Sequence, residues 1–499
     1  MAKVIKVLGP PGTGKTTTLL EYVHKEMETV PIERIGYFSF TRKAAHEARD
    51  RAVEKFGLDK KQFKWFSTLH SCGLHSINQE GRTIMGPPHF RSFAEKIGLK
   101  AKLVVDTETG MSDNIYLNQH NLARARGISL EEHYRKYVDT TEVDWKYLEH
   151  LSTGYDQFKE DNKYIDFCDM CYEAVNNNLL PVLDVVFIDE AQDLTPLQWS
   201  MIEHFAETSQ RLYLAGDDDQ AIYRWLGVDV ERFIDYPAEQ IVLPKSYRLK
   251  KKIQKFAQDI IKITKNRIPK EWEPREEDGV VKYHQRIDSI DFSKGNWLLL
   301  GRDKFILNKL EEECRDQGLW YEKQEHKNIT KPIAKRMFDA IIGWTDLMEG
   351  KMVDKKMIKK IFFYKKVADA YEEKLEPLHD SHLYDLNSLK ILLGPFSVGD
   401  WYQALDKINL QDRAYLKRLR MKNEDITKKP RIKISTIHAA KGGECDNVLL
   451  TTDMNIKTYS AYQKDSDDEK RVFYVGATRA KEELHVLLPQ TTMHLKLAL

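Results

Sequence analysis

The sequence predicts an α/β protein with two blocks of parallel strands, each interrupted by a mainly helical insertion. Short apolar runs recur along the chain, and each ends in glycine or polar residues. Amphipathic helical patterns lie between many of these runs, and this alternation is typical of parallel sheets. The runs are residues 4–8, 34–40, 64–68, 184–188, 211–215, 240–243, 297–300, 432–437, 447–451 and 484–488.

The strand candidates and the helical stretches divide the chain into four parts. A chain of 499 residues is too long for one ordinary core, so several domains are expected. Two long stretches carry helical periodicity with few strand signals: the first has many aromatic residues, and the second is rich in lysine and glutamate. We expect a first domain at 1–75 and 170–240 with a helical insertion at 76–169. We expect a second domain at 241–305 and 431–499 with a helical insertion at 306–430.

The composition is that of a globular protein and selects no single class of partner. Hydrophobic residues make up 41% of the chain, and the formal net charge of +1 neither requires nor excludes a nucleic acid. No run reaches the ~18 consecutive apolar residues of a membrane span. The start of the chain lacks a signal-peptide pattern. We therefore expect a cytoplasmic protein, of a bacterium or of a virus-infected cell, with no membrane partner.

A glycine-rich loop follows the first apolar run and precedes a helical pattern. Its spacing, GxxxxGKT, is that of the phosphate-binding loop of nucleotide hydrolases. Backbone N–H groups of such a loop, together with the N-terminus of the next helix, surround a phosphate chain. We expect Lys15 to reach the β- and γ-phosphates and the Thr16 hydroxyl to hold Mg²⁺. The loop comprises Gly9, Pro10, Pro11, Gly12, Thr13, Gly14, Lys15 and Thr16.

A pair of carboxylates follows the apolar run at 184–188. Asp189 and Glu190 come directly after it. A parallel strand beside the first one would place both at the carboxyl edge of the sheet, where ligands bind. Asp189 would hold Mg²⁺, directly or through water. Glu190 would orient or deprotonate the water that attacks the γ-phosphate.

Several ordered motifs together resemble those of the superfamily 1 DNA helicases of the UvrD/Rep/PcrA type. Examples are FSFTRKAA for "TFTNKAA", STLHS for "TFHS", DEAQD, GDDDQAIYRW for "GDxDQSIYRW" and YVGATRA for "YVGxTRA". The matching segments appear in the order that the family has, and they cover both strand blocks. They are residues 38–45, 67–71, 165–170, 189–193, 216–225, 247–248, 435–444 and 474–480.

The resemblance implies two RecA-like domains with ATP in the cleft between them. It assigns Gln220 to the γ-phosphate and the attacking water. Arg248 and Arg479 would come from the second domain and reach the γ-phosphate, where such arginines contribute roughly 10³–10⁵ in rate in related hydrolases. Tyr247 resembles the tyrosine that stacks on adenine, and Glu444 resembles the residue near the ribose.

The resemblance also implies a track for single-stranded DNA across both domains. Binding without sequence preference uses aromatic platforms for the bases and polar groups for the phosphates. Trp225 is favoured over Tyr223 as the base platform. The residues expected along the track are Phe40, Thr41, Thr68, His70, Tyr223, Trp225, Thr436 and His438.

These assignments predict an ATP-dependent, single-stranded DNA translocase and DNA helicase. The resemblance implies 3′-to-5′ travel, Mg²⁺ as the metal, tailed or forked duplexes as substrates and a monomeric protein. Two alternatives stay open: a helicase of the same superfamily that acts on RNA, and a clamp that binds ATP and a strand without processive unwinding. The intact Glu190, Arg248 and Arg479 favour real turnover over a clamp.

The chain also departs from the family pattern. Only three residues precede the first strand, which leaves no room for the family's glutamine segment that reads adenine, so the preference for ATP stays open. Arg42 stands where asparagine is usual, Thr17 where arginine is frequent after the phosphate loop, and Gly443 where leucine is usual. We include Thr17 among the nucleotide-binding candidates. The short end after the last strand predicts a streamlined helicase without a partner-binding tail.

Overall fold

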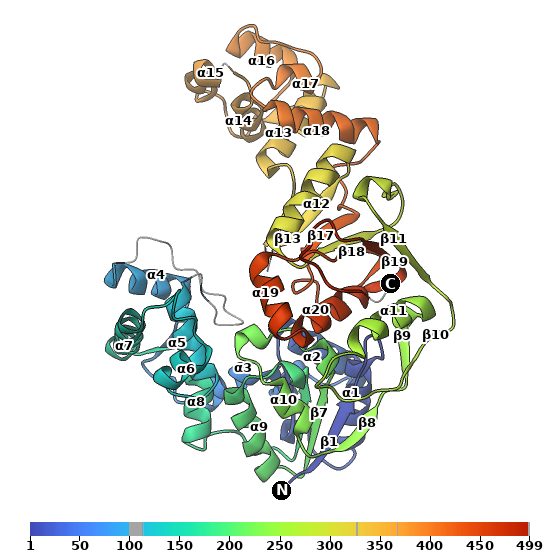
Figure 1. The fold of residues 1–499 in the computed structure, drawn as a ribbon. Coiled ribbons are helices and arrows are strands. Elements are labelled where there is room, and N and C mark those ends of the chain that lie inside the picture. Colours follow the sequence, from blue (N-terminus) through green and yellow to red (C-terminus); the bar gives the residue numbers. More distant parts are fainter. Residues whose placement is uncertain (99–111, 113, 326–327, 367, 498–499) are drawn as a thin grey trace. The chain divides into compact units, whose positions relative to one another are not determined.

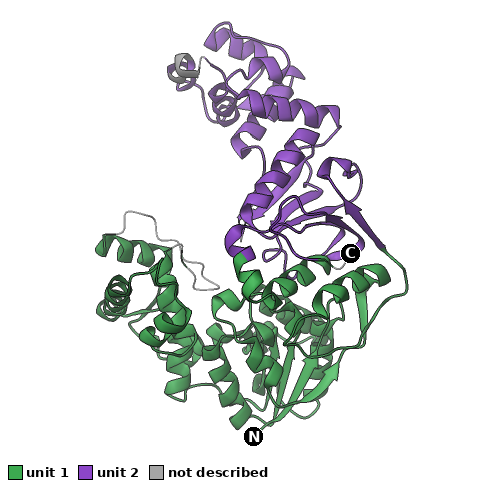
Figure 2. Ribbon diagram, viewed as in Figure 1, with its two compact units in different colours: residues 1–279, 460–478, 497–499 green, residues 280–459, 479–496 purple. Residues whose placement is uncertain are grey.

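The computed structural model describes residues 1–98, 112, 114–325, 328–366 and 368–497. It divides into two compact units (Figure 2). Unit 1 comprises residues 1–279, 460–478 and 497–499, and unit 2 comprises residues 280–459 and 479–496. Each unit contains its own mainly parallel sheet with helices packed around it (Figure 1). The predicted α/β fold class is confirmed.

The sheet of unit 1 has six strands in the order β3-β2-β6-β7-β1-β8, and all neighbours are parallel. Its central strand β6 is buried along its whole length, as expected for a parallel sheet that is covered on both faces. The strands are β1 (Lys3–Leu8), β2 (Ile35–Ser39), β3 (Phe66–Thr68), β6 (Val185–Asp189), β7 (Arg211–Gly216) and β8 (Glu239–Val242).

Two hydrophobic clusters cover the two faces of this sheet. On one face, α1 (Lys15–Glu26) and α2 (Arg42–Phe56) pack against the strands through Leu19, Val23 and Ala48. On the other face lie α3 (Leu69–Ser76), α8 (Phe167–Asn176) and α9 (Pro196–Thr208), which contributes Trp199 and Phe205. Because the strands are parallel, β1, β2, β6 and β7 all end at the same edge, where their polar continuations gather.

A helical segment lies between β3 and β6 and has a small core of its own. Phe90, Phe93, Leu117, Leu151 and Tyr155 form the centre of that core. The segment contains β4 (Thr83–Ile84), α4 (Pro87–Lys96), α5 (Ile115–Ala125), α6 (Leu130–Tyr137), α7 (Trp145–Asn162) and β5 (Tyr164–Ile165), followed by α8.

Unit 1 also contains residues that the sequence analysis assigned to the second domain. These are the segments 241–279 and 460–478. The predicted four-part division of the chain stays a prediction. These two segments contain β9 (Lys245–Lys250), α11 (Lys251–Ile261), β10 (Glu273–Arg275) and α20 (Asp467–Ala477). Between β7 and β8, unit 1 also contains η4 (Asp218–Gln220), η5 (Arg224–Leu226) and α10 (Val230–Asp235). Short 3₁₀ turns also occur at η1 (Ile32–Arg34), η2 (Lys60–Gln62) and η3 (Ala191–Asp193).

The sheet of unit 2 has seven strands in the order β11-β19-β18-β12-β17-β13-β14. Only β13 and β14 pair antiparallel. Neither β11 nor β13 was among the expected strands. The sequence of β13 contains charged residues, which do not indicate a buried strand. In the structure Glu322 and Lys323 are nevertheless buried, and Lys323 forms an ion pair with Glu311. The strands are β11 (Val280–His284), β12 (Trp297–Gly301), β13 (Tyr321–Glu325), β14 (Asn328–Thr330), β17 (Ile432–Thr436), β18 (Cys445–Thr451) and β19 (Ala480–Leu487).

The other elements of unit 2 are mainly helices, which lie both before and after β14 in the chain. One hydrophobic cluster joins them to the sheet through residues such as Trp344, Leu389 and Tyr415. Of the helices that the structure describes, none has the length and apolarity that a bilayer crossing requires. The elements are η6 (Ile287–Ser289), α12 (Lys304–Gln317), α13 (Lys335–Met348), β15 (Val353–Asp354), α14 (Lys355–Phe363), α15 (Ala368–Leu375), β16 (Leu383–Tyr384), α16 (Leu386–Leu393), α17 (Trp401–Ala404) and α18 (Leu410–Met421). Helix α19 (Ile456–Lys464) follows β18, and its residues from 460 on belong to unit 1.

Candidate active site

The phosphate loop connects β1 to α1 at the carboxyl edge of the first sheet (Figure 1). Gly12 and Gly14 both have φ of 75°, in the left-handed region that glycine adopts without strain. Helix α1 begins at Lys15 and has no side-chain cap, so N–H groups of its first turn have no partner inside the helix. A helix start of this kind is a ready site for an anion.

The segment that carries Tyr247 and Arg248 lies directly against this loop within unit 1. The Tyr247 N–H donates to the Gly12 carbonyl (2.8 Å), and the Ser246 hydroxyl donates to the Pro11 carbonyl (2.7 Å). A Cβ added at Gly12 would lie 2.4 Å from the Cβ of Arg248, so only glycine fits here. Tyr247 is 71% exposed, which leaves its ring accessible to a ligand.

Asp189 and Glu190 lie where β6 ends, beside the phosphate loop. Asp189 is buried, and its Oδ2 accepts the Thr16 hydroxyl at 3.3 Å and the Tyr37 hydroxyl at 2.9 Å. Glu190 has φ of 59°, a left-handed conformation that is unfavourable for a residue with a side chain. Its N–H donates to Asp189 Oδ1 at 2.9 Å. The two adjacent carboxylates have different side-chain partners, since Asp189 accepts from Thr16 and Tyr37, while Glu190 contacts Lys15 and Gln192.

Lys15 is the cation that faces these carboxylates. Its Nζ lies 2.9 Å from Glu190 Oε1. Burial opposes the charge on Lys15, but the nearby Glu190 and Asp189 outweigh it and raise the pKa of the ammonium group. Burial also raises the pKa of Asp189, although Lys15 opposes this shift. The site therefore favours the charged form of Lys15, whereas burial makes the charged form of Asp189 less favourable than it is in water.

A chain of hydrogen bonds runs from Lys15 to Gln220. Gln192 Nε2 donates to Glu190 Oε2 (2.6 Å), and Gln192 Oε1 accepts the Asp217 N–H (3.0 Å). Gln220 Nε2 then donates to Asp217 Oδ2 (2.7 Å). The structure therefore connects the lysine, the carboxylate and the glutamine that the sequence analysis singled out, and Gln192 and Asp217 are the links.

A buried ionic cluster fixes the turn η4 that carries Gln220. Lys270 Nζ lies 2.9, 2.5 and 3.0 Å from carboxylate oxygens of Asp217, Asp218 and Asp219. Arg267 makes two hydrogen bonds to Asp219, at 2.8 and 2.6 Å. These side chains are buried or nearly so. The turn is consequently held from the segment between α11 and β10.

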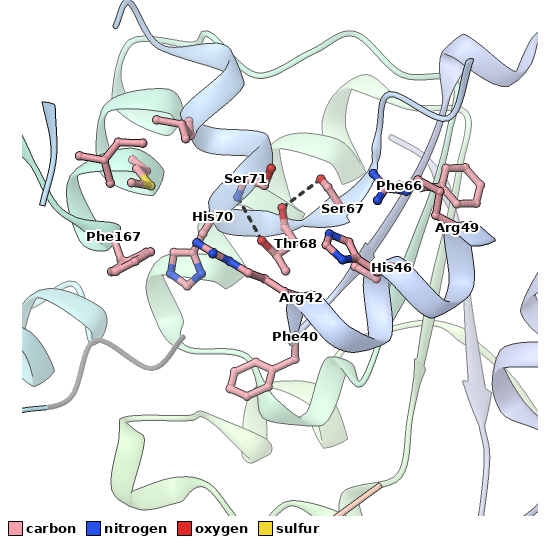
Figure 3. Close-up of a pocket in the computed structure, with 14 residues that line it drawn as sticks. Phe40, Arg42, His46, Arg49, Phe66, Ser67, Thr68, His70, Ser71 and Phe167 are labelled. Atoms are coloured by element: carbon pink, nitrogen blue, oxygen red, sulfur yellow. Dashed lines mark hydrogen bonds between the residues drawn. The ribbon is translucent and has the colours of Figure 1, made fainter. Parts of the chain in front are cut away.

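A pocket of about 280 Å³ opens beside the first turns of α2 and α3 (Figure 3). Arg42 and His70 lie close together in it, and the His70 ring meets Phe167 edge-on with centroids 5.7 Å apart. Burial and the neighbouring Arg42 lower the pKa of His70 to about 4, so His70 is neutral at physiological pH. The pocket is lined by Phe40, Arg42, Ala45, His46, Arg49, Phe66, Ser67, Thr68, His70, Ser71, Leu74, Ile84, Phe167 and Met170.

Two threonines predicted to contact DNA cap helices in this region. The Thr41 hydroxyl oxygen accepts the Ala44 N–H at 3.2 Å, and the Thr68 hydroxyl oxygen accepts the Ser71 N–H at 3.2 Å. Each threonine therefore stabilises the start of α2 or α3. A contact with DNA remains a prediction for both.

Three predicted DNA-binding aromatics lie next to one another. The rings of Phe40 and Tyr223 stack with centroids 5.8 Å apart, and Trp225 meets Tyr223 edge-on at 6.5 Å. Trp225 is 48% exposed, which is unusual for a tryptophan and leaves much of its surface open to solvent. Phe40 comes from the end of β2 and Tyr223 from the turn after η4, so the row adjoins the element that carries Gln220.

The other candidates lie in unit 2. Thr436 ends β17, and its hydroxyl oxygen accepts the Ala439 N–H at 3.1 Å. Arg479 directly precedes β19, is buried, and donates to the Gly443 carbonyl at 3.0 Å. His438 and Glu444 lie in the connection between β17 and β18. The roles predicted for these residues stay predictions.

Sequence reasoning did not identify Tyr37, Gln192, Arg267 or Lys270. The importance of these residues comes from contacts between segments that are far apart in the chain. Of the four, Gln192 lies in the DEAQD motif, but no role was predicted for it. Thr17 is exposed on the first turn of α1. Among the described residues, no group of three or more His, Cys, Asp or Glu side chains forms a metal cage. A site made from Thr16 and Asp189 depends on oxygen ligands that the phosphates would complete.

Two family models match the chain. The model of the UvrD/REP helicase N-terminal domain matches residues 1–239, and that of the UvrD-like helicase C-terminal domain matches residues 400–491. The first match includes the phosphate loop, both carboxylates and Gln220. The second includes Thr436, His438, Glu444 and Arg479.

Curated proteins similar to this chain include ATP-dependent DNA helicases named PcrA. The protein of Bacillus subtilis (strain 168) is 25% identical over 385 residues, which cover 71% of this chain and 49% of that protein. The protein of Staphylococcus aureus (strain Mu50) is 23% identical over 394 residues, which cover 72% and 51%. The chain thus spans about half the length of these relatives.

Proposed function

Because the chain belongs to the UvrD/Rep helicase family, we propose that it is an ATP-dependent translocase on single-stranded DNA and a DNA helicase. The observation that carries this proposal is the continuous network from Lys15 through Glu190 and Asp217 to Gln220. This network joins the phosphate loop to the element beside the Phe40 and Tyr223 row. A change at the nucleotide can therefore reach Gln220 through direct contacts, and Tyr223 of the proposed DNA surface follows shortly after Gln220 in the chain.

The residues at the loop fit a magnesium nucleotide. The left-handed glycines and the uncapped start of α1 form an anion cradle, and the Thr16 hydroxyl and an Asp189 carboxylate oxygen lie 3.3 Å apart as hard oxygen donors. Thr16 and Asp189 would hold Mg²⁺, which when bound neutralises charge on the phosphate oxygens. The exposed Tyr247 would contact the base, and Thr17 would contact the phosphates from α1.

In the proposed mechanism three residues have separate roles: Lys15, Glu190 and Gln220. Lys15 neutralises the phosphates, and in the described structure it is held by Glu190. On binding, the phosphates compete for Lys15, which frees Glu190 to accept a proton from water. Gln220 contacts the γ-phosphate and that water, and so reports hydrolysis to the DNA site. Asp217 holds the Gln220 amide in place. Arg248, Arg479 and Glu444 keep the nucleotide roles that the family resemblance implies.

Single-stranded DNA would bind across the row of Phe40, Tyr223 and Trp225. Aromatic faces accept any base, and the adjacent pocket offers Arg42 and His70 to the backbone. Thr41 and Thr68, and in unit 2 Thr436 and His438, are proposed polar contacts. We propose 3′-to-5′ travel by a monomer.

Replacing Trp225 with alanine should weaken binding of single-stranded DNA by about 1–3 kcal/mol, because one base loses its stacking partner. Fluorescence anisotropy with labelled oligothymidylate measures this loss. Tyr172→Ala is the matched control, since Tyr172 is 58% exposed on α8 outside the row. If the Trp225→Ala variant binds single-stranded DNA as tightly as the unmodified protein does, Trp225 does not contact the DNA.

Unwinding of duplexes with a 3′ or a 5′ single-stranded tail tests the proposed function. We expect ATP-dependent strand separation from the 3′ tail and none from the 5′ tail. Parallel reactions with other nucleoside triphosphates and with RNA tails determine which nucleotide and which strand are used. ATP hydrolysis without any strand separation would instead identify a clamp, and separation from RNA tails alone would identify an RNA helicase.

A further inference from the structure

Tyr37 is a buried tyrosine whose hydroxyl reaches the carboxylate proposed to hold Mg²⁺. It lies in the middle of β2, next to β6 in the sheet, and is fully buried. The hydroxyl donates to Asp189 Oδ2 at 2.9 Å, the same oxygen that accepts the Thr16 hydroxyl at 3.3 Å. Neither the phosphate loop nor the acidic motif includes Tyr37.

The tyrosine ring is held in one place by an aromatic row across the sheet. Tyr37 lies directly opposite Phe66 on β3 and Phe187 on β6, and its ring stacks on both, with centroids 5.4 and 6.3 Å apart. Phe187 in turn stacks on Tyr213 of β7 at 4.5 Å. Rings packed on both sides in a close-packed core have little free space around them. The hydroxyl therefore has a fixed position relative to the strand end.

The Asp189 carboxylate is fixed at both oxygens. Oδ1 accepts the Glu190 N–H, and Oδ2 accepts the Tyr37 hydroxyl. The Thr16 hydroxyl is a proposed metal ligand, so with Mg²⁺ bound it would no longer donate to Asp189. Tyr37 is then the side chain that continues to orient Oδ2. Partners of this kind, one step removed from the metal, hold a ligating carboxylate in its binding orientation.

We propose that Tyr37 is a positioning residue for magnesium binding, and that its hydroxyl holds Asp189 in the orientation that binds the magnesium nucleotide. This inference rests on the proposed function. In the described structure the Tyr37 hydroxyl is the donor of this bond and Asp189 Oδ2 is the acceptor.

Tyr37→Phe removes the hydroxyl and keeps the ring. We expect the Mg²⁺ concentration for half-maximal binding of a fluorescent ADP derivative to rise about 10-fold, the lower end of the effect of such partners on metal affinity. The Mg²⁺ concentration for half-maximal ATP hydrolysis should rise in parallel. Affinity for the same derivative in EDTA should be unchanged, because the phosphate loop is intact.

Tyr213→Phe is a matched control in the same row. The Tyr213 hydroxyl donates to Glu26 Oε1 at 2.7 Å, a buried bond to a carboxylate at the opposite end of the strands from the phosphate loop. Both variants should lower the melting temperature by a similar few degrees. Only Tyr37→Phe should change the Mg²⁺ titration.

Three results would overturn the inference. In the first, Tyr37→Phe titrates with Mg²⁺ as the unmodified protein does. In the second, both variants shift the titration equally, which indicates general destabilisation. In the third, Tyr37→Phe loses affinity equally in EDTA and in Mg²⁺. If the unmodified protein binds no magnesium nucleotide, the proposed function fails as well, and that outcome is distinguishable because it needs no variant.

Discussion

Lys15→Ala should abolish ATP turnover, with kcat reduced by at least about 10³-fold, the upper end of what one charge-stabilising donor contributes. Lys15 is the ammonium group at the start of α1, and its Nζ lies 2.9 Å from Glu190. Alanine there removes the positive charge proposed to meet the phosphates, and leaves the nearby carboxylates to repel them. Binding of single-stranded DNA should persist, because the aromatic row does not include Lys15.

Phosphate release and DNA anisotropy, measured on the same preparation, check both parts of this prediction. Lys25→Ala is the control, since Lys25 is exposed near the other end of α1. A Lys15→Ala protein that keeps a tenth or more of the turnover would contradict the assigned role. Loss of DNA binding together with turnover would indicate that the unit has unfolded.

Glu190→Gln should lower kcat by about 10²–10⁴-fold while nucleotide binding is kept. The glutamine has nearly the same shape, and its carbonyl oxygen can still accept a hydrogen bond from Gln192 or Lys15. It cannot take a proton from water. The difference between the two side chains is therefore confined to the chemical step.

Single-turnover hydrolysis, together with binding of a fluorescent nucleotide, separates that step from affinity. Glu21→Gln supplies a control on exposed α1 surface. If Glu190→Gln turns over within about tenfold of the unmodified protein, a different group must deprotonate the water. The left-handed backbone at Glu190 would then have only a structural role.

The parts of the site that depend on short stretches of sequence were predictable. The loop from Gly9 to Thr16 and the two carboxylates at the end of β6 follow from the order of strand, turn and helix, which can be recognised in the sequence itself. Parallel strands then bring these stretches to one edge of the sheet. The aromatic row of Phe40, Tyr223 and Trp225 was predicted as separate residues, and the structure shows that they are neighbours.

The supporting contacts were not predictable because they join segments far apart in the chain. Lys270 is an ordinary lysine in the sequence, and only the folded chain surrounds it with three carboxylates. Tyr37 has the pattern of a core strand residue, and its hydroxyl acquires a role from Asp189 on another strand. The strand β13 was missed for a similar reason, since Lys323 finds Glu311 only after folding.

The proposed function requires that binding of single-stranded DNA changes the rate of ATP hydrolysis. Measuring that rate with and without an oligonucleotide tests this coupling directly. The network from Lys15 to Gln220 and the adjoining aromatic row predict that saturating single-stranded DNA raises the rate about tenfold or more, within the range of coupling between two sites. If the protein hydrolyses ATP at the same rate with and without single-stranded DNA, the proposed coupling is contradicted.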